Sequence, residues 1–147
     1  MPIQWDEIEN FEREEFDDPN CPGSGDLFDY KMLLRIARIR QCIGWPMISH
    51  APVGGAVDVN GSWGHAEYSY HLKDMGACAL DFHFITDAPT REQFHKMMCA
   101  GFTGLGIYYD WHWNGYILPV GFHIDSRSRH RTQVWKREDG TYIYLLN

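Results

Sequence analysis

Residues 77–85 read ACALDFHFI, and this stretch constrains the fold more than any other. Its residues are apolar and favour β structure, and Asp81 and His83 are the only interruptions. Successive side chains of a strand point to opposite faces, so these two polar side chains share one face. A carboxylate buried in such a strand needs a paired charge or a metal ion. The pattern therefore predicts a strand in which Asp81 contacts either a group of opposite charge or a metal ion.

Helical and strand patterns alternate along the rest of the chain. A stripe of apolar residues after Asp26 predicts one helix that Gly44 ends, and a second helix follows Pro89 and stops at Gly101. Further strands are predicted at residues 45–49, 105–109 and 116–124, with a closing hairpin around Asp139-Gly140. These elements predict a single α+β domain over residues 1–147, with two main helices and a small antiparallel sheet of four to five strands.

Composition excludes several classes of partner. The net charge of −7 with neutral histidines disfavours binding to a phosphate backbone, so we expect no nucleic-acid partner. No apolar run approaches the roughly 20 residues of a membrane helix, so we expect no membrane partner. The first ten residues, MPIQWDEIEN, lack the layout of a signal peptide, which predicts a protein that is cytoplasmic as synthesised.

A long loop precedes the strand that carries Asp81. Residues 50–68 are rich in glycine and contain Asn60-Gly61, which predicts a surface loop. Loops of this length in a compact domain are usually functional. We therefore expect functional residues where this loop approaches the strand that carries Asp81.

Metal ligation is the chemistry that the residue types favour. The four cysteines form no CxxC pair and HExxH is absent, which excludes zinc-finger spacing and the commonest helical zinc-protease arrangement. Ligands on strands and loops remain, and the candidates are His50, His65, His71, Asp81, His83, His95, His112, His123 and Asp125. Among them, His71 precedes a run of small residues that leads to Asp81, and His123 shares a strand face with Asp125. If the two strands are neighbours, Asp81 and His123 converge on one ion.

Ordered motifs make the chain resemble the M15 family of zinc D-Ala-D-Ala carboxypeptidases and related peptidoglycan endopeptidases. The family's first signature runs Ser-x-His-x-x-Gly-x-Ala-x-Asp, and the similar residues here are Ser69, His71, Ala79 and Asp81. Residues 104–108 (GLGIY) resemble its Gly-x-Gly-x-Tyr stretch, and residues 122–125 (FHID) resemble its aromatic-x-His-x-Asp segment. The resemblance runs in order over most of the chain.

The resemblance implies a hedgehog/DD-peptidase-like fold and a Zn²⁺ ion held by His71, Asp81 and His123. It also implies a metallopeptidase that hydrolyses peptidoglycan stem peptides with a metal-activated water, as a D,D-carboxypeptidase or an endopeptidase. Ser69 and Tyr108 are then candidates for contacts with the peptide substrate. Ser69 has a second interpretation, in which it hydrogen-bonds the loop that carries His71.

The chain departs from the family pattern at three places. The interval from His71 to Asp81 is three residues longer than the signature, with residues 73–75 as the extra segment. Residues 49–52 (SHAP) stand where the family usually carries an arginine for the substrate carboxylate. Val120 stands where several branches place a catalytic Glu or Asp.

The general base is therefore open. Asp125 is the first candidate for this catalytic role, because it lies two residues from His123 on the same strand face. An equally favoured alternative is that the Asp125 carboxylate hydrogen-bonds a metal-ligand histidine and so orients its ring. His112 is the reserve catalytic candidate, with Asp110 behind it.

Two other interpretations stand beside the peptidase. The same fold, still with its zinc, would serve as a catalytically inactive binding or structural module, or it would be a hydrolase for another peptide or amide. An enzyme acting on the cell wall needs a route to it, and an endolysin of phage type, released to the wall, would fit.

Overall fold

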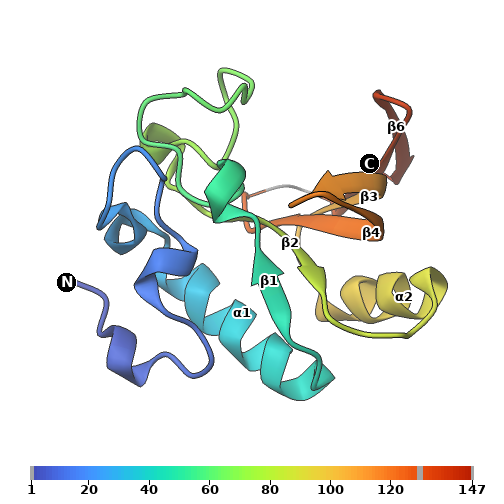
Figure 1. Ribbon diagram of the computed structural model, residues 1–147, viewed down its shortest axis with the longest axis horizontal. Helices are drawn as coiled ribbons and strands as arrows, with labels where there is room; N and C mark the ends of the chain where they lie inside the picture. The colour runs from blue at the N-terminus through green and yellow to red at the C-terminus, as the bar shows by residue number, and fades with distance from the viewer. Residues whose placement is uncertain (1, 129–130, 147) are drawn as a thin grey trace.

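A computed structural model describes residues 2–128 and 131–146 as one sheet with two helices (Figure 1). The helices are α1 (Tyr30–Ile43) and α2 (Thr90–Ala100). The strands are β1 (Met47–Ser49), β2 (Ala79–Phe84), β3 (Gly104–Trp113), β4 (Tyr116–Asp125), β5 (Gln133–Glu138) and β6 (Thr141–Leu146). The predicted α+β class and the two main helices are confirmed.

The sheet is larger than expected and is mixed. Its six described strands lie in the order β1-β2-β4-β3-β5-β6, whereas four to five antiparallel strands were predicted. The β3–β5 pair is parallel and the other pairs are antiparallel. The cause lies in the order of the whole sheet: β4 is already paired on both edges, so β5 joins the free edge of β3. It begins with Gln133 beside Gly104, where β4 ends with Asp125, and so it runs in the direction of β3.

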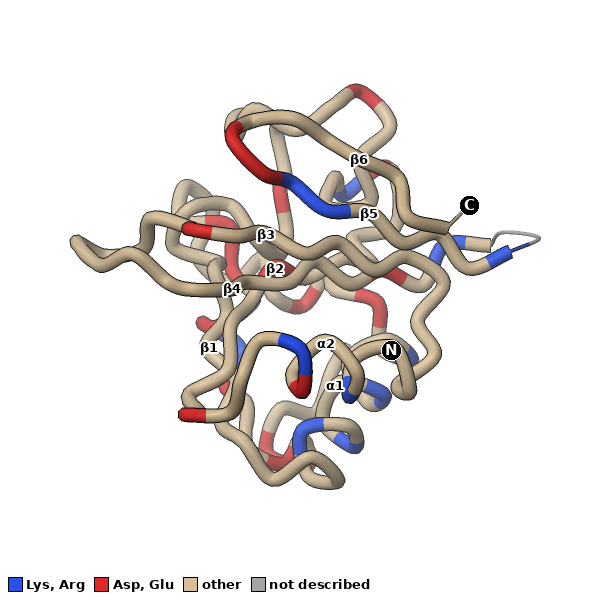
Figure 2. The backbone as a smooth tube through the Cα atoms, turned by 90° about the vertical axis from the view of Figure 1, so that its right-hand side faces the viewer, with Lys and Arg blue, Asp and Glu red and all other residues tan. Residues whose placement is uncertain are grey.

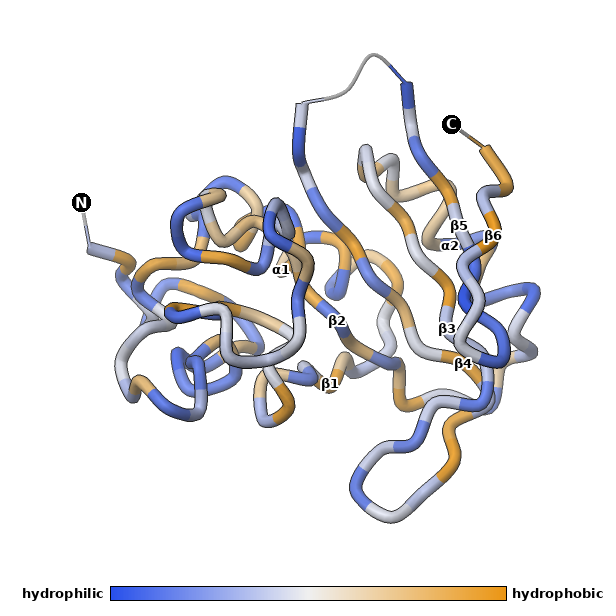
Figure 3. The backbone as a smooth tube through the Cα atoms, turned by 90° about the horizontal axis from the view of Figure 1, so that it is seen from above, coloured by the Kyte–Doolittle hydropathy of each residue, from blue (hydrophilic) through white to orange (hydrophobic). Residues whose placement is uncertain are grey.

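The two faces of the sheet have different chemistry. Both helices cover one face, and Figures 1 and 2 show α1 and α2 on the same side of the strands. The side chains turned toward the helices form the core; they include Leu80, Phe82, Leu105, Ile107, Phe122 and Ile124. Alternation places Asp81 and His123 on the opposite face, and hydrophobic and hydrophilic segments accordingly alternate along the strands in Figure 3. The face away from the helices is thus left for the functional groups.

The N-terminal segment belongs to the core through its aromatic rings. Phe16 is fully buried, and its ring centroid lies 5.5 Å from that of Trp5, 5.4 Å from that of Phe11 and 4.8 Å from that of Phe28. Such ring contacts add to the free energy of burial. The N-terminal segment is therefore anchored to the rest of the domain by its aromatic residues.

Neither α1 nor α2, nor any shorter helix within residues 2–128 and 131–146, has the length and apolar character needed to cross a membrane.

Phe16→Ala is expected to destabilise the whole domain. Removing a fully buried ring costs about 3–5 kcal/mol of unfolding free energy. Urea unfolding followed by tryptophan fluorescence measures this loss. The control is Leu34→Ala, since Leu34 is 44% exposed on α1, and its free energy of unfolding should change by about 0.5 kcal/mol or less. Equal losses in the two variants would contradict the anchoring role of Phe16.

Candidate metal centre

Three side chains meet on the open face of the sheet. His71 comes from the loop before β2, Asp81 from β2 and His123 from β4. Asp81 Oδ1 lies 2.9 Å from His123 Nδ1 and 3.3 Å from His71 Nε2. The two imidazole nitrogens are 3.2 Å apart. Three potential ligand atoms, from residues far apart in the sequence, are therefore mutually within hydrogen-bonding distance.

Strand pairing brings two of these residues together. Asp81 on β2 is the direct antiparallel partner of His123 on β4, so the condition for their convergence, that the two strands are neighbours, is met. Partners across an antiparallel pair point to the same face with their Cβ atoms close together. The sheet itself therefore fixes the contact between the carboxylate and the imidazole.

The third residue is held by the backbone of the loop. His71 O accepts a hydrogen bond from Asp58 N at 2.9 Å, and the His71 Nδ1–H donates to Ala56 O at 3.0 Å. When the ring is neutral, the second bond keeps its proton on Nδ1, which leaves Nε2 as the nitrogen with a lone pair facing Asp81 and His123. His71 is only 2% exposed, so the loop presents one ring nitrogen in a fixed direction.

The three extra residues of the interval do not displace His71. They form the short 3₁₀ helix Lys73–Met75, and Ala77 N then donates to Leu72 O at 3.1 Å. The chain therefore leaves and returns at nearly the same point. Ala77 has a φ of 45°, a left-handed conformation that closes this excursion. The insertion loops out, and His71 and Asp81 still meet.

Asp125 orients His123 from behind. The His123 Nε2–H donates to Asp125 Oδ2 at 3.0 Å, and the guanidinium of Arg127 donates to the same carboxylate through Nη2 at 3.1 Å. Asp125 is fully buried. A carboxylate hydrogen-bonded to the far nitrogen of a ligand histidine is the usual outer support of a metal site. Of the two roles considered for Asp125, this geometry favours orientation.

The electrostatics of the metal-free group favour ionisation of both partners. Burial opposes the charged form of Asp81, but the neighbouring His71 and His123 hold the pKa of this carboxyl well below its usual range. Burial would also lower the pKa of His123, but hydrogen bonds to Asp125 and Asp81 outweigh it and raise this pKa to about 9. Without a metal, His123 is thus a cation between two carboxylates at neutral pH.

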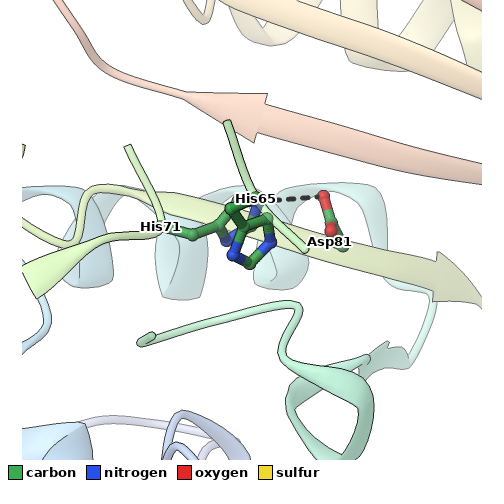
Figure 4. Close-up of side chains that lie close together, drawn as sticks. All are labelled: His65, His71 and Asp81. Atoms are coloured by element: carbon green, nitrogen blue, oxygen red, sulfur yellow. Dashed lines mark ion pairs between the residues drawn. The ribbon is translucent and has the colours of Figure 1, made fainter. Parts of the chain in front are cut away.

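A fourth polar side chain stands at the same place. His65, from the loop, has a ring nitrogen that lies with ligand atoms of His71 and Asp81 inside a span of 4.8 Å, and this group can hold a metal ion. Figure 4 shows the rings of His65 and His71 one over the other, with the Asp81 carboxylate beside them. The His65 Nδ1–H donates to Asp58 Oδ2 at 2.8 Å. His65 was one of nine candidates in the sequence, and no local pattern singled it out.

The centre opens into a cleft of about 840 Å³. The loop lines one side of it, with Trp63 and His65 among its residues, and the β5–β6 hairpin lines the other. Figure 2 shows that hairpin curling away from the helices. Ser69 and Tyr108, the predicted substrate contacts, both line this cleft. Ser69 Oγ also accepts a bond from His71 N at 3.4 Å.

Two glycines make room for the cleft's tryptophans. A Cβ on Gly106 would lie 2.7 Å from Trp135 Nε1, and a Cβ on Gly121 would lie 2.4 Å from Trp111 Cε3. Trp111 reaches this face because Asp110, with a φ of 50°, interrupts the alternation of β3. The Trp111 ring then lies 4.5 Å, centroid to centroid, from Tyr108.

The reserve base does not join the group. His112 is exposed, and it lies with Asp110 and Glu138 along a separate pocket beside the β5–β6 turn. The strand predicted at residues 105–109 extends further than expected, because β3 continues to Trp113 and only Asn114 and Gly115 turn. His112 is not among the residues that line the cleft of the centre.

A second histidine pair lies next to the centre. His50 Nε2 is 2.8 Å from His83 Nδ1, and the His50 ring stacks on Trp113 with centroids 4.1 Å apart. His50 is fully buried, and burial lowers its pKa to about 4. It is therefore neutral at pH 7, and residues 49–52 present no cation where the resemblance leads one to expect an arginine.

Comparisons with protein families, with curated proteins and with solved structures find no match to this chain.

Metal binding is expected to release about one proton per ion at pH 7. His123 Nδ1 must lose its proton to become a ligand, and the pKa of this ring is about 9 in the metal-free state. Affinity should therefore rise as pH increases from 7 to 9, by up to about tenfold per unit. Calorimetric titration of Zn²⁺ in buffers of different ionisation enthalpy counts the protons. A pH-independent affinity with no proton release would contradict this assignment.

Asp125→Asn is expected to weaken Zn²⁺ binding by about 10–100-fold, because the support behind His123 loses its charge. The matched control is Asp74→Asn, whose side chain is exposed on the inserted turn. Competition with a chromogenic chelator measures both affinities. Equal affinities in the two variants would show that Asp125 does not act through His123.

Proposed function

We propose that the protein is a zinc-dependent peptidase in which His71, Asp81 and His123 hold the ion. The observation that carries this proposal is the convergence of their three ligand atoms within 3.3 Å of one another on the wall of an 840 Å³ cleft. The order of the motifs along the chain, similar to that of the M15 family, supports the same ligand set.

The spacing and donor types fit zinc. A tetrahedral ion that binds nitrogen at about 2.0–2.1 Å separates its ligand atoms by roughly 3.3 Å. The observed separations of 2.9–3.3 Å are close to that value. Two imidazoles and a carboxylate suit Zn²⁺ better than Mg²⁺ or Ca²⁺, which prefer oxygen ligands. Each histidine also donates its other N–H to a protein oxygen, as ligand histidines usually do.

Three protein ligands on an open cleft favour a catalytic over a structural role. Structural zinc sites have four protein ligands and are commonly rich in cysteine, whereas catalytic sites leave a position for water or substrate. When bound, Zn²⁺ polarises a substrate carbonyl and makes a water molecule acidic enough to attack near neutral pH. The cleft's aromatic walls then hold the peptide against this position.

Tyr108 is a candidate donor to the substrate. Burial, and after it the charge of Asp81, raise the pKa of the Tyr108 phenol well above its ordinary value. The hydroxyl therefore keeps its proton throughout the neutral range and donates a hydrogen bond to a peptide oxygen in the cleft. Ser69, at the cleft edge, can accept from the peptide backbone.

We propose peptidoglycan stem peptides as the substrate class, and this part rests on the resemblance to the M15 family. A hedgehog/DD-peptidase-like fold is proposed on the same ground. A phage-type lysin, released to the cell wall, would bring such an enzyme to its substrate.

One observation favours a catalytically inactive module as the second candidate. Val120, where related branches place a carboxylate, is buried in the core on the helix side of β4. A base at that position would point away from the cleft. The peptidase therefore needs a base from another element, and the inactive module does not.

Zinc content and hydrolysis together test the proposal. The purified protein is expected to hold about one zinc per chain, to release a fragment from muropeptides between about pH 5 and 9, and to lose this activity with a chelator until zinc is restored. His71→Ala and Asp81→Ala should lose both the metal and the activity. The control is His95→Ala, which should keep both the metal and the activity. His95 is exposed on α2, a helix that covers the opposite face of the sheet from the centre.

Two results would contradict it. Stoichiometric zinc that survives in both ligand variants would rule out this centre. Zinc that binds at the centre without hydrolysis of any muropeptide or peptide would leave the inactive module.

A further inference from the structure

We infer that His65 is the general base of this centre and that Asp58 positions it. The inference rests on the proposed peptidase function and supplies the base that the peptidase needs. Neither His65 nor Asp58 belongs to the motifs of the resemblance or to the three proposed metal ligands.

Asp58 is built into the protein as a fixed acceptor. It is fully buried, and its Oδ1 accepts hydrogen bonds from Gly61 N at 2.7 Å and Ser62 N at 3.2 Å. Its backbone is tied to the metal-site segment, since Asp58 N donates to His71 O and Lys73 N donates to Asp58 O. The remaining oxygen, Oδ2, is the one that accepts from His65 Nδ1 at 2.8 Å. The carboxylate therefore has a defined direction before any substrate binds.

This contact decides the tautomer of His65. With Nδ1–H directed at Asp58, Nε2 is the nitrogen that carries the lone pair. The His65 side chain is 17% exposed and lines the cleft beside His71 and Asp81. A buried carboxylate that orients a partly exposed imidazole is the arrangement by which enzymes prepare a histidine to accept a proton.

Ring orientation separates His65 from the metal ligands. The rings of His65 and His71 are nearly parallel, with an interplanar angle of 10° and centroids 4.4 Å apart. An imidazole lone pair lies in the ring plane, so two stacked rings direct their lone pairs side by side and not at one point. The His71 and His123 rings are instead inclined at 70° and their nitrogens converge at 3.2 Å. By distance alone His65 could be a metal ligand. The ring orientations instead favour His123 as the second histidine ligand, and His65 stacks on His71 and lines the cleft.

The proton transfer balances without another reactant. His65 Nε2 takes a proton from the attacking water while the water oxygen forms the new bond to the peptide carbonyl carbon. The same proton then passes to the amide nitrogen as the C–N bond breaks, which gives a carboxylic acid and an amine. The acid's proton then moves to the amine, so the final products are a carboxylate end and an ammonium end. Asp58 keeps the imidazole in place during both transfers and does not itself exchange the proton.

His65→Ala is the direct test, made on the zinc-loaded protein. Its kcat should fall about 10²–10⁴-fold, as for loss of a general base, while KM changes little and zinc remains near one per chain. Added imidazole should restore part of the rate, which a purely structural role of His65 would not allow. His95→Ala again serves as the unchanged control, because His95 is an exposed histidine on α2.

If His65→Ala disturbs the structure of the loop, a second variant and an NMR spectrum of the wild type test the same role of His65. Asp58→Asn retains an Oδ1 acceptor for Gly61 and Ser62 but loses the carboxylate, so kcat should fall with zinc still bound. Nitrogen-15 NMR of the zinc-loaded wild type should show His65 with a proton on Nδ1 and an unmetallated Nε2. The metal-dependent shifts should instead appear at His71 and His123.

The outcomes separate this inference from the proposed function. A wild type that binds zinc but cuts no peptide overturns the function and the base together. An active wild type whose His65→Ala variant keeps its kcat overturns the base alone. Loss of zinc in His65→Ala, or a metal shift on His65 Nε2, makes His65 a fourth ligand and also overturns the base alone.

Discussion

The contact between Asp81 and His123, direct partners on β2 and β4, is the constraint on which the rest of the centre depends. Such a pair of ionisable groups is unfavourable away from water unless each group finds a partner. Here Asp81 finds two imidazoles and His123 finds two carboxylates. Phe82 and Phe122 follow and precede the polar pair along their strands, and their full burial toward the helices favours this single register. The hydrophobic face of the sheet thus enforces the geometry of the polar face.

Period-two reasoning was sufficient for the parts of the fold that depend on local alternation. It placed Asp81 on one face of its strand, and it placed His123 and Asp125 together on one face of theirs. When the two strands pair, these faces lie on the same side of the sheet. It could not foresee Trp111 on the cleft side, because that depends on the left-handed conformation of Asp110. The parallel β3–β5 pair was missed for another reason. Which edge remains free for β5 is a property of the whole sheet and is not encoded in the residues of β5 itself.

The role of Asp125 shows the limit of arguments from strand faces. Its position two residues from His123 was compatible with a base facing the cleft or with a carboxylate facing the ring. The choice depends on the His123 Nε2–Asp125 contact and on the Arg127 guanidinium that occupies the same carboxylate. Asp125 accepts from His123 Nε2 and from Arg127 N, Nε and Nη2. Because a carboxylate has about four acceptor sites, it has little capacity left for a water proton. Side-chain geometry, which alternation does not specify, decides between the two roles.

The long loop is where sequence reasoning is weakest and where the proposed base is found. Its glycines and polar residues indicate a surface loop, but they do not indicate that Asp58 and His65, seven residues apart, face each other. That contact depends on the turn at Gly61 and Ser62, whose amides bind the other oxygen of Asp58. Val120 lies in the core, so a base at that position of β4 is impossible in this register. The two proposed ligands of the sheet, Asp81 and His123, occupy its polar face at this point. A base for the proposed reaction therefore comes from an element that lines the cleft over this face, and the loop is such an element.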